Sequence, residues 1–253
     1  MLKTRVIPVL LIKDGGLIKT IGFGKEKYVG DPINAIRIFN EKEVDELVLL
    51  DIMASKEKRN PPFERIEEVV SECFMPLCFG GGVNDIEDMS RIFGLGIEKI
   101  ALNHILLFDL GFLKRSAEQF GSQSVVASID VKKNLWGNYK VYSHVDGRTM
   151  DRDPIEFARE IEEAGAGEIF LNSVDMDGTF NGYDLRLVKD VSEAVDIPVI
   201  ACGGAGTIAD LRDAAKIGGA SAVAAGSMFV FHGKHRAVLI NYPSYRELER
   251  EIV

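Results

Sequence analysis

The chain has 253 residues, of which 46% are hydrophobic and 27% charged, a composition typical of globular rather than disordered proteins. Its 39 acidic and 30 basic residues give a formal net charge of −9, which disfavours binding to nucleic acids or to anionic membranes. The longest uncharged stretch near the C-terminus, residues 217–231, is too short to span a membrane. The first residues lack a signal-peptide pattern, so we expect a cytoplasmic protein.

The cysteines and histidines predict neither a metal site nor a cofactor. Cys73, Cys78 and Cys202 show no Cys-x-x-Cys spacing, which argues against a disulfide framework or a zinc site. Cys78 and Cys202 lie in apolar runs and are expected to be small core residues in a reducing compartment. His232 and His235 have no acidic or sulfur ligand beside them, so a solvated loop is favoured over a metal site.

Short β-branched apolar runs alternate with helical patterns along the chain. The expected strands are residues 6–11, 46–51, 75–79, 99–102, 124–130, 168–172, 197–201 and 222–225. The expected helices are residues 32–41, 63–73, 86–93, 110–120, 154–163, 184–194 and 208–216, with Asp31 and Thr207 as candidate caps. Parallel strands joined by helical crossovers, in a chain of this length, predict a single (β/α)8 TIM barrel. A doubly wound open sheet is the alternative. The Gly-rich residues 13–30 are expected to form a mobile loop over the barrel mouth.

The second half of the chain repeats the first at an offset of about 120 residues. Residues 76–83 match residues 198–205, and residues 49–51 match residues 170–172. The offset is about half the chain, whereas solenoid periods are much shorter. We therefore predict one barrel made of two duplicated half-barrels, residues 1–123 and 124–253.

Two Gly-rich turns follow matching strands and predict a pair of phosphate-binding cradles. Glycine lets backbone N–H groups approach an anion, and a following helix N-terminus adds partial positive charge. Because barrel active sites lie at the C-terminal ends of the strands, the two cradles would face each other across the mouth. A substrate with a phosphate at each end follows; tight turns that need positive φ are the alternative. The cradle residues are Gly81, Gly82, Asn103, Gly203, Gly204, Gly226 and Ser227.

Asp130 ends the fifth expected strand on its inward face and is the candidate catalytic residue. A carboxylate between two phosphate sites can act as a general acid or base, although a helix cap or salt bridge is the alternative. The duplication places Leu11 opposite Asp130, and leucine can do no proton chemistry. Asp177 and Gly178 end the sixth strand, where Asp177 would orient a substrate hydroxyl or a phosphate-binding turn; a structural Asp-Gly turn is the alternative.

Four charged residues, two basic and two acidic, stand at the starts of expected strands and can point inward together at the barrel floor. Because buried charges must pair, composition favours a structural plug over a functional ring. These residues are Arg5, Glu46, Lys99 and Glu168.

These motifs together resemble the cyclase subunit of imidazole glycerol phosphate synthase along the chain to about Phe231. The resemblance rests on residues 5–8, 13–15, 45–52, 80–83, 120–123, 128–132, 165–169, 177–179, 182–184 and 203–206. It implies a heterodimer in which a glutaminase subunit docks on the barrel floor and releases ammonia. The ammonia would pass the charged ring, acting as a gate, and would travel through the barrel to the mouth.

At the mouth, the resemblance implies that ammonia attacks a bisphosphorylated ribulosyl-aminoimidazole-carboxamide ribonucleotide. Cyclisation and cleavage, a carbon–nitrogen lyase reaction of histidine biosynthesis, give imidazole glycerol phosphate and a purine precursor. In the family, two aspartates at the ends of the first and fifth strands act as acid and base. Only the second, Asp130, is present here, because Leu11 occupies the first position.

Losing a positioned acid–base group typically lowers the rate by about 10²–10⁴-fold. Residues 20–24 and His104 also depart from the family, and residues 232–243 are not its usual last helix. The tail resembles a paralogous branch found with surface-polysaccharide genes, in which the barrel and a glutaminase feed ammonia to a separate sugar amidotransferase.

Three functions follow, and whether this chain is itself an enzyme depends on the consequence of Leu11. The first, which we favour, is a divergent paralogue that handles ammonia for amidation of a surface-glycan (lipopolysaccharide) sugar. The second is an authentic cyclase of histidine biosynthesis. The third is a non-catalytic subunit that activates the glutaminase.

Overall fold

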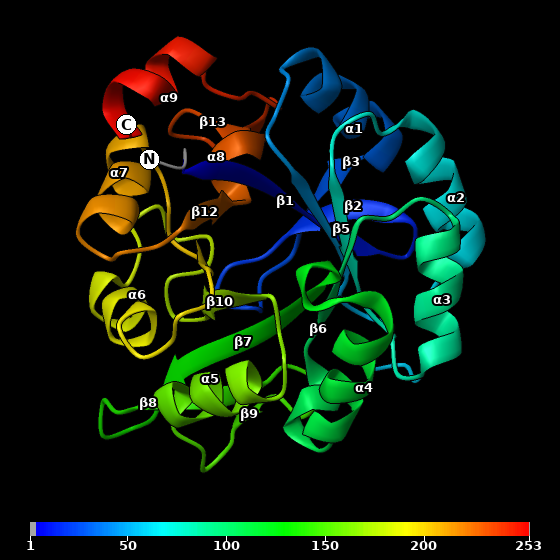
Figure 1. Ribbon diagram of the computed structural model, residues 1–253. Helices are drawn as coiled ribbons and strands as arrows, with labels where there is room; N and C mark the ends of the chain where they lie inside the picture. The colour runs from blue at the N-terminus through cyan, green and yellow to red at the C-terminus, as the bar shows by residue number, and fades with distance from the viewer. Residues whose placement is uncertain (1–3, 253) are drawn as a thin grey trace.

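The computed structural model describes residues 4–252 and forms a closed barrel of parallel strands surrounded by helices (Figure 1). The strand order is β10–β11–β12–β1–β4–β5–β6–β7, and pairing of β7 with β10 closes the barrel. The strands are β1 (Arg5–Lys13), β4 (Leu47–Asp51), β5 (Leu77–Gly80), β6 (Lys99–Leu102), β7 (Val125–Lys133), β10 (Glu168–Ser173), β11 (Val199–Cys202) and β12 (Ala222–Ala225). The predicted (β/α)8 architecture is therefore confirmed, and the open sheet is excluded. The predicted boundary between two half-barrels stays a prediction.

The helices between the strands follow the predicted periodicity closely. They are α1 (Pro32–Glu41), α2 (Phe63–Glu72), α3 (Ile86–Gly94), α4 (Leu110–Phe120), α5 (Pro154–Glu163), α6 (Leu185–Ser192) and α7 (Ile208–Lys216), with the 3₁₀ turns η1 (His104–Leu107) and η2 (Ser122–Ser124). Asp31 caps α1 by accepting from the Asn34 N–H at 3.1 Å, and Thr207 caps α7. Both predicted caps are confirmed.

Two apolar layers form because strand side chains alternate between the inside and the outside of the barrel. In β1, Ile7, Val9 and Leu11 point into the barrel, whereas Val6 and Leu10 pack under the helices. The interior is lined almost wholly by apolar side chains. Besides these β1 residues, it contains Val48, Leu50, Cys78, Ala101, Val126, Phe170, Ile200, Cys202, Ala222 and Ala224.

The prediction that residues 13–30 form a loop is wrong for most of the segment, whereas its predicted mobility stays a prediction. The segment continues β1 as an antiparallel ribbon of β2 (Gly16–Lys19) and β3 (Lys27–Gly30), in which Leu11 pairs with Ile18. The turn at Asp14 and Gly15 has φ of 50° and 77°, the left-handed pair that a two-residue hairpin requires. The Asp-Gly dipeptide was the sequence signal for this turn.

Other ribbons and short helices follow the barrel strands. β8 (Tyr139–Ser143) and β9 (Arg148–Thr149) extend β7, and the chain ends with α8 (Ser227–Val230), β13 (Phe231–His232), β14 (Ala237–Val238) and α9 (Tyr245–Ile252). The helical prediction missed α9, which packs against α7. His232 lies exposed in β13, and residues 4–252 contain no group of three or more histidine, cysteine, aspartate or glutamate side chains placed to hold a metal.

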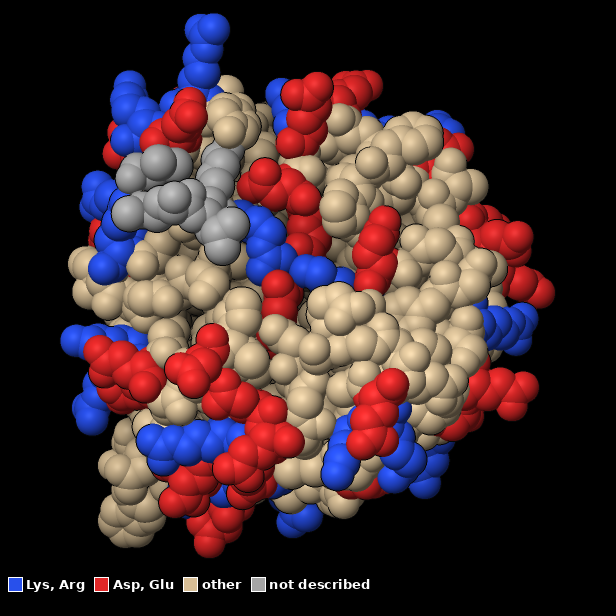
Figure 2. Space-filling model, in the orientation of Figure 1, with Lys and Arg blue, Asp and Glu red and all other residues tan. Residues whose placement is uncertain are grey.

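The molecular surface shows no dominant area of basic charge on the face in Figure 2, where acidic and basic side chains are interspersed. Cys73, Cys78 and Cys202 are free thiols, and the last two are buried as predicted. Within residues 4–252, no helix is both long enough and apolar enough to cross a membrane.

Candidate functional site

A cavity of about 510 Å³ opens at the C-terminal ends of the barrel strands. All of the residues predicted at the mouth line it, and Leu11 lines it with them. These residues are Gly81, Gly82, Asn103, Asp130, Asp177, Gly178, Gly203, Gly204, Gly226 and Ser227. The structure therefore brings the mouth residues together, whereas the four charged floor residues lie at the opposite ends of the strands.

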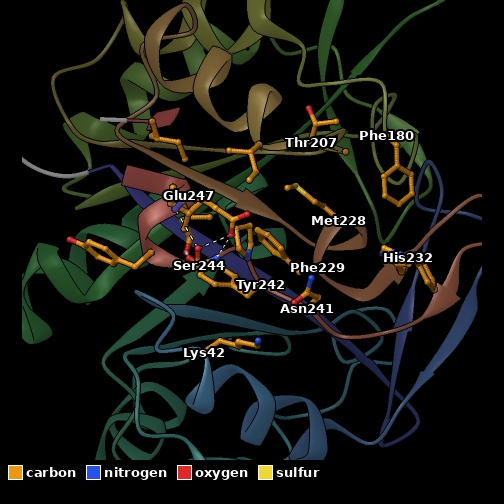
Figure 3. Close-up of a pocket in the computed structure, with 18 of the residues that line it drawn as sticks. Lys42, Phe180, Thr207, Met228, Phe229, His232, Asn241, Tyr242, Ser244 and Glu247 are labelled. Atoms are coloured by element: carbon orange, nitrogen blue, oxygen red, sulfur yellow. Dashed lines mark hydrogen bonds between the residues drawn. The ribbon is translucent and has the colours of Figure 1, made fainter. Parts of the chain in front are cut away.

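A larger cavity, about 1070 Å³, lies outside the barrel wall between the end of α1 and the C-terminal segment (Figure 3). Its lining includes Lys42, Phe229 and Tyr242, and inside it the Ser244 hydroxyl donates to Glu247 Oε2 at 2.7 Å. None of the predicted site residues lines this cavity. The mouth cavity is therefore the candidate functional site.

Asp130 lies buried in the mouth between two amide side chains. Its Oδ2 accepts a hydrogen bond from Asn103 Nδ2 at 3.2 Å, and Asn103 Nδ2 also donates to the Ser128 carbonyl at 3.0 Å. Burial raises the pKa of Asp130 to about 7, although the hydrogen bonds from Asn103 and Asn172 act in the opposite direction. A carboxyl group with a pKa near neutrality can both take and give a proton at the mouth.

Replacing Asp130 with asparagine should stabilise the fold above neutral pH. The folded-state pKa of Asp130 lies above its usual value of 3.8, so the folded state binds the proton more tightly and stability falls as pH rises from about 4 to about 7. The free energy of unfolding of Asp130→Asn should therefore exceed that of the wild type by about 2–4 kcal/mol at pH 8. It should exceed it by far less at pH 4, and urea unfolding at the two pH values measures the difference. An equal effect at both values would contradict the raised pKa.

Lys19 is a mouth residue that the sequence prediction missed. Its side chain is 4% exposed, and Nζ donates to the Val9 carbonyl inside the cavity. Burial lowers the pKa of Lys19 to about 8, against the opposing charge of Asp177. Only the β2 ribbon aims this lysine inward, so a sequence interpretation that treated residues 13–30 as a loop could not find it.

Asp177 holds the loop between β2 and β3 over the mouth through hydrogen bonds. It accepts from the Thr20 hydroxyl at 2.7 Å and from the Phe23 N–H at 3.2 Å, while its own carbonyl accepts from the Gly22 N–H. Burial raises the pKa of Asp177, opposed by these hydrogen bonds. Asp177 therefore positions the β2–β3 loop in addition to facing the cavity.

Both predicted cradles have the same backbone character. Gly81, Gly82, Gly203 and Gly204 all adopt positive φ, between 75° and 123°. At Gly204, a Cβ atom would lie 2.0 Å from the Gly182 carbonyl oxygen, so a side chain cannot be accommodated. The start of α7 is less free than predicted, because Asp210 already accepts from the N–H groups of Gly206 and Thr207.

We predict that phosphate or sulfate binds at both cradles. Gly204→Ala should abolish binding only at the cradle that contains Gly203 and Gly204. The added methyl group must displace the Gly182 carbonyl, and we expect it also to lower stability by at least ~1 kcal/mol. Crystals soaked in sulfate measure the occupancy. Gly94→Ala is the matched control, because nothing lies within 4 Å of its Cβ position. Wild-type crystals with both cradles accessible and unoccupied would contradict the prediction.

Further polar groups line the mouth that the sequence prediction did not assign. Asp51 accepts from the Met53 and Ala54 N–H groups and pairs with Arg59 at 3.2 Å. His144 Nε2 lies 2.8 Å from the Ile52 carbonyl oxygen. His104 is a second histidine of the mouth, and burial lowers its pKa. Asp51 ends β4, whereas His104 and His144 follow β6 and β8, so only the closed barrel brings these residues into one cavity.

The four predicted floor residues form a closed ring of ion pairs. Arg5 contacts Glu46 at 2.5 Å and Glu168 at 2.6 Å, and Lys99 contacts the same two carboxylates at 3.1 and 3.0 Å. Each charge has two neighbours of opposite sign, as burial requires. These ion pairs therefore close the barrel floor, as both a structural plug and a gate for a partner protein would require.

The closed parallel barrel and its polar mouth define a (β/α)8-barrel protein of the kind that carries its active site at the strand C-termini. The chain belongs to the histidine biosynthesis protein family, whose model matches residues 5–236.

The relatives carry the name of one enzyme subunit. A Pseudomonas aeruginosa protein named provisionally as imidazole glycerol phosphate synthase subunit hisF2 is 58% identical over 249 residues, covering 98% of this chain and 99% of the relative. A Vibrio vulnificus protein named provisionally as subunit hisF3 is 46% identical, covering 100% and 97%. The Hyphomonas neptunium protein named as imidazole glycerol phosphate synthase subunit HisF is 43% identical, covering 91% of each chain.

Proposed function

We propose that this chain is a divergent paralogue of the cyclase subunit that receives ammonia from a glutaminase partner and delivers it through the barrel. The ammonia would serve a separate amidotransferase acting on a surface-glycan sugar. Leu11 is the observation that carries the proposal. β1 and β7 lie four strands apart in the ring of eight, so Leu11 and Asp130 stand on opposite sides of the mouth.

Among residues 4–252, no other carboxylate that lines the mouth is free to replace the missing one. Glu26 is paired with Lys13 at 2.6 Å. Asp51 is occupied by two backbone N–H groups and by Arg59. Asp177 is occupied by Thr20 and Phe23 of the ribbon loop. Leu11 itself packs with Leu50 against the apolar interior. The family's mechanism uses a carboxylate on each of two sides of the substrate, and only the Asp130 side supplies one.

The floor and the interior support ammonia delivery. The ring of Arg5, Glu46, Lys99 and Glu168 closes one end of an interior that is lined almost wholly by apolar side chains, which suit the passage of neutral ammonia. In the loop between α2 and β5, at the same end of the barrel as the ring, the Phe74 side chain is 84% exposed. Exposed aromatic residues are the side chains most enriched at the centres of protein interfaces, so Phe74 is a docking contact for the glutaminase subunit.

The names of the relatives fit the same proposal. All three describe a subunit, which requires a second chain to complete the enzyme, and two carry the numbered names hisF2 and hisF3, as expected for a paralogous branch.

An authentic cyclase of histidine biosynthesis is the second candidate. It is favoured by Asp130, whose pKa of about 7 suits general acid–base catalysis, and by the two facing pairs of positive-φ glycines, which suit a substrate with two phosphates.

An ammonium-dependent cyclase assay separates the two candidates. The purified barrel is supplied with the bisphosphorylated ribonucleotide and an ammonium salt, which bypasses the glutaminase. The proposal expects almost no imidazole glycerol phosphate, while the barrel still stimulates glutamine hydrolysis by its partner. Turnover with kcat of about 1 s⁻¹ or more, a rate ordinary for enzymes, would establish the authentic cyclase instead.

A further inference from the structure

Two acceptor side chains stand side by side at the mouth on neighbouring strands. Asn172 of β10 and Asp130 of β7 are register partners, and the Asn172 amide hydrogen-bonds the Asp130 carboxyl group. The other end of that amide, Asn172 Oδ1, is buried and finds no donor within residues 4–252. A buried acceptor without a donor costs about 1–3 kcal/mol, so such an atom in a functional cavity indicates a ligand that carries N–H or O–H groups.

Asp130 likewise lacks a cation. The ion pairs among residues 4–252 do not include it, and the nearby buried ammonium group of Lys19 donates to the Val9 carbonyl instead. Among residues 4–252, the donors to this carboxyl group are the neutral amides of Asn103 and Asn172. A carboxyl group that is only 7% exposed and has no positive partner is stabilised either by a proton or by a small cation.

The surroundings restrict what that cation can be. Leu11, Leu50 and Phe170 line the same cavity, so a hydrated ion would have to lose most of its water there. The two acceptors lie side by side rather than forming the cage of six or more oxygens that Ca²⁺ takes, or the octahedron that Mg²⁺ demands. A small ion with its own directional N–H donors matches a carboxylate oxygen next to an amide oxygen.

We propose that Asp130 and Asn172 form a station that holds one ammonium ion, or ammonia with the shared proton on Asp130, at the exit of the barrel. The inference rests on the proposed function, because it names the residues that bind the delivered ammonia at the barrel exit. Ammonium on the carboxylate and ammonia on the carboxylic acid contain the same atoms and the same net charge. When ammonia leaves, one N–H bond breaks and its proton stays on Asp130.

The pH dependence follows from the groups that face Asp130. Burial is the main cause that raises the pKa values of Asp130, Tyr142 and Cys202, and Asp177 raises that of Asp130 further, so Tyr142 and Cys202 are neutral near pH 7. Lys19, His104 and His144 also line the cavity. Ammonium binds the ionised carboxylate, so its affinity should increase as pH rises from about 6 to about 8.

Titration of the free barrel with ammonium chloride tests the station without a partner protein. The ¹³C carboxyl resonance of Asp130 is followed by NMR at constant ionic strength, with potassium chloride and tetramethylammonium chloride as controls. Ammonium should shift the resonance in a saturable way and bind at least tenfold more tightly than potassium. Tetramethylammonium, which has no N–H donor, should not bind. Equal shifts with potassium would overturn the proposal.

Asn172→Leu should weaken ammonium binding about tenfold, because the amide acceptor is lost while the volume is kept. Asn138→Leu is the matched control, since Asn138 is exposed in the β7–β8 turn outside the cavity. Asp130→Asn provides a second measurement. The ¹⁵N-edited proton signal of bound ammonium should disappear in this variant, and a signal that persists in both Asn172→Leu and Asp130→Asn would refute the station.

The outcomes separate the station from the proposed function. If ammonium binds at Asp130 and Asn172 but the wild-type barrel is a fast cyclase, the station stands and glycan amidation fails. The opposite result is that the assay detects no imidazole glycerol phosphate and the glutaminase is activated, but ammonium does not bind. The delivery function then stands and the station fails.

Discussion

Leu11→Asp should raise the ammonium-dependent cyclase activity of this barrel by about 10–10²-fold over a very low wild-type rate. A general acid–base group in position is typically worth about 10²–10⁴-fold, and the new carboxylate would stand across the mouth from Asp130. The gain should be partial. Leu11 packs beside Leu50 in an apolar environment, so burying a carboxylate there is costly and raises its pKa.

Leu11→Asn is the control for this experiment, because it has the shape and polarity of aspartate without a titratable proton. It should give no increase in the formation of imidazole glycerol phosphate. The free energy of unfolding of both variants should fall by similar amounts of about 1–3 kcal/mol, measured by urea unfolding. A wild-type rate near that of ordinary enzymes, or an equal gain in Leu11→Asn, would refute the requirement for a second acid–base group.

Reversing one charge of the floor ring should both destabilise the barrel and uncouple the proposed glutaminase partner. In Glu46→Lys, a 3%-exposed carboxylate would be replaced by a positive charge, so three cations would share the ring with Glu168 alone. Breaking a buried ion pair in this way costs about 3–5 kcal/mol, so we expect a loss of about 3 kcal/mol for this partly solvated ring. Lys99→Glu should behave similarly. Urea unfolding and glutamine hydrolysis by the complex measure the two effects.

A fully reversed ring distinguishes a gate from a plug. The variant Arg5→Glu, Glu46→Lys, Lys99→Glu and Glu168→Lys restores alternation of charge, and its stability should recover. A gate that recognises the glutaminase should remain defective in this variant, whereas a plug should work normally. Arg37→Glu is the surface control: its pair with Glu72 is exposed, so stability should change by no more than about 0.5 kcal/mol. If single reversals leave glutamine hydrolysis unchanged in a folded barrel, the ring is only a plug.

Local patterns in the sequence were sufficient to predict the barrel, its mouth residues and its floor ring. Each predicted strand is short and apolar, and each is separated from the next by a helix of 3.6-residue period, so the parallel closure follows from connectivity. Parity along β1 placed Arg5, Ile7, Val9 and Leu11 on one face without any tertiary information. The internal duplication gave the opposition of Leu11 and Asp130, on which the proposed function depends.

Only the tertiary structure showed which side chains are buried at the mouth, which of them are neighbours and how burial shifts their pKa values. Lys19 becomes a buried mouth residue only because the β2 ribbon folds back on β1, and the Asp14–Gly15 turn signal lay inside a Gly-rich segment that suggested a loop. The pKa values of Asp130 and Lys19 move toward neutrality because the closed barrel removes both side chains from water. The neighbouring Asn172 and Asp130 are 42 residues apart in the sequence and meet through the pairing of β7 with β10 that closes the barrel. Sequence thus determines which chemical groups each strand presents, whereas barrel closure determines which of them become partners and how far burial alters their protonation.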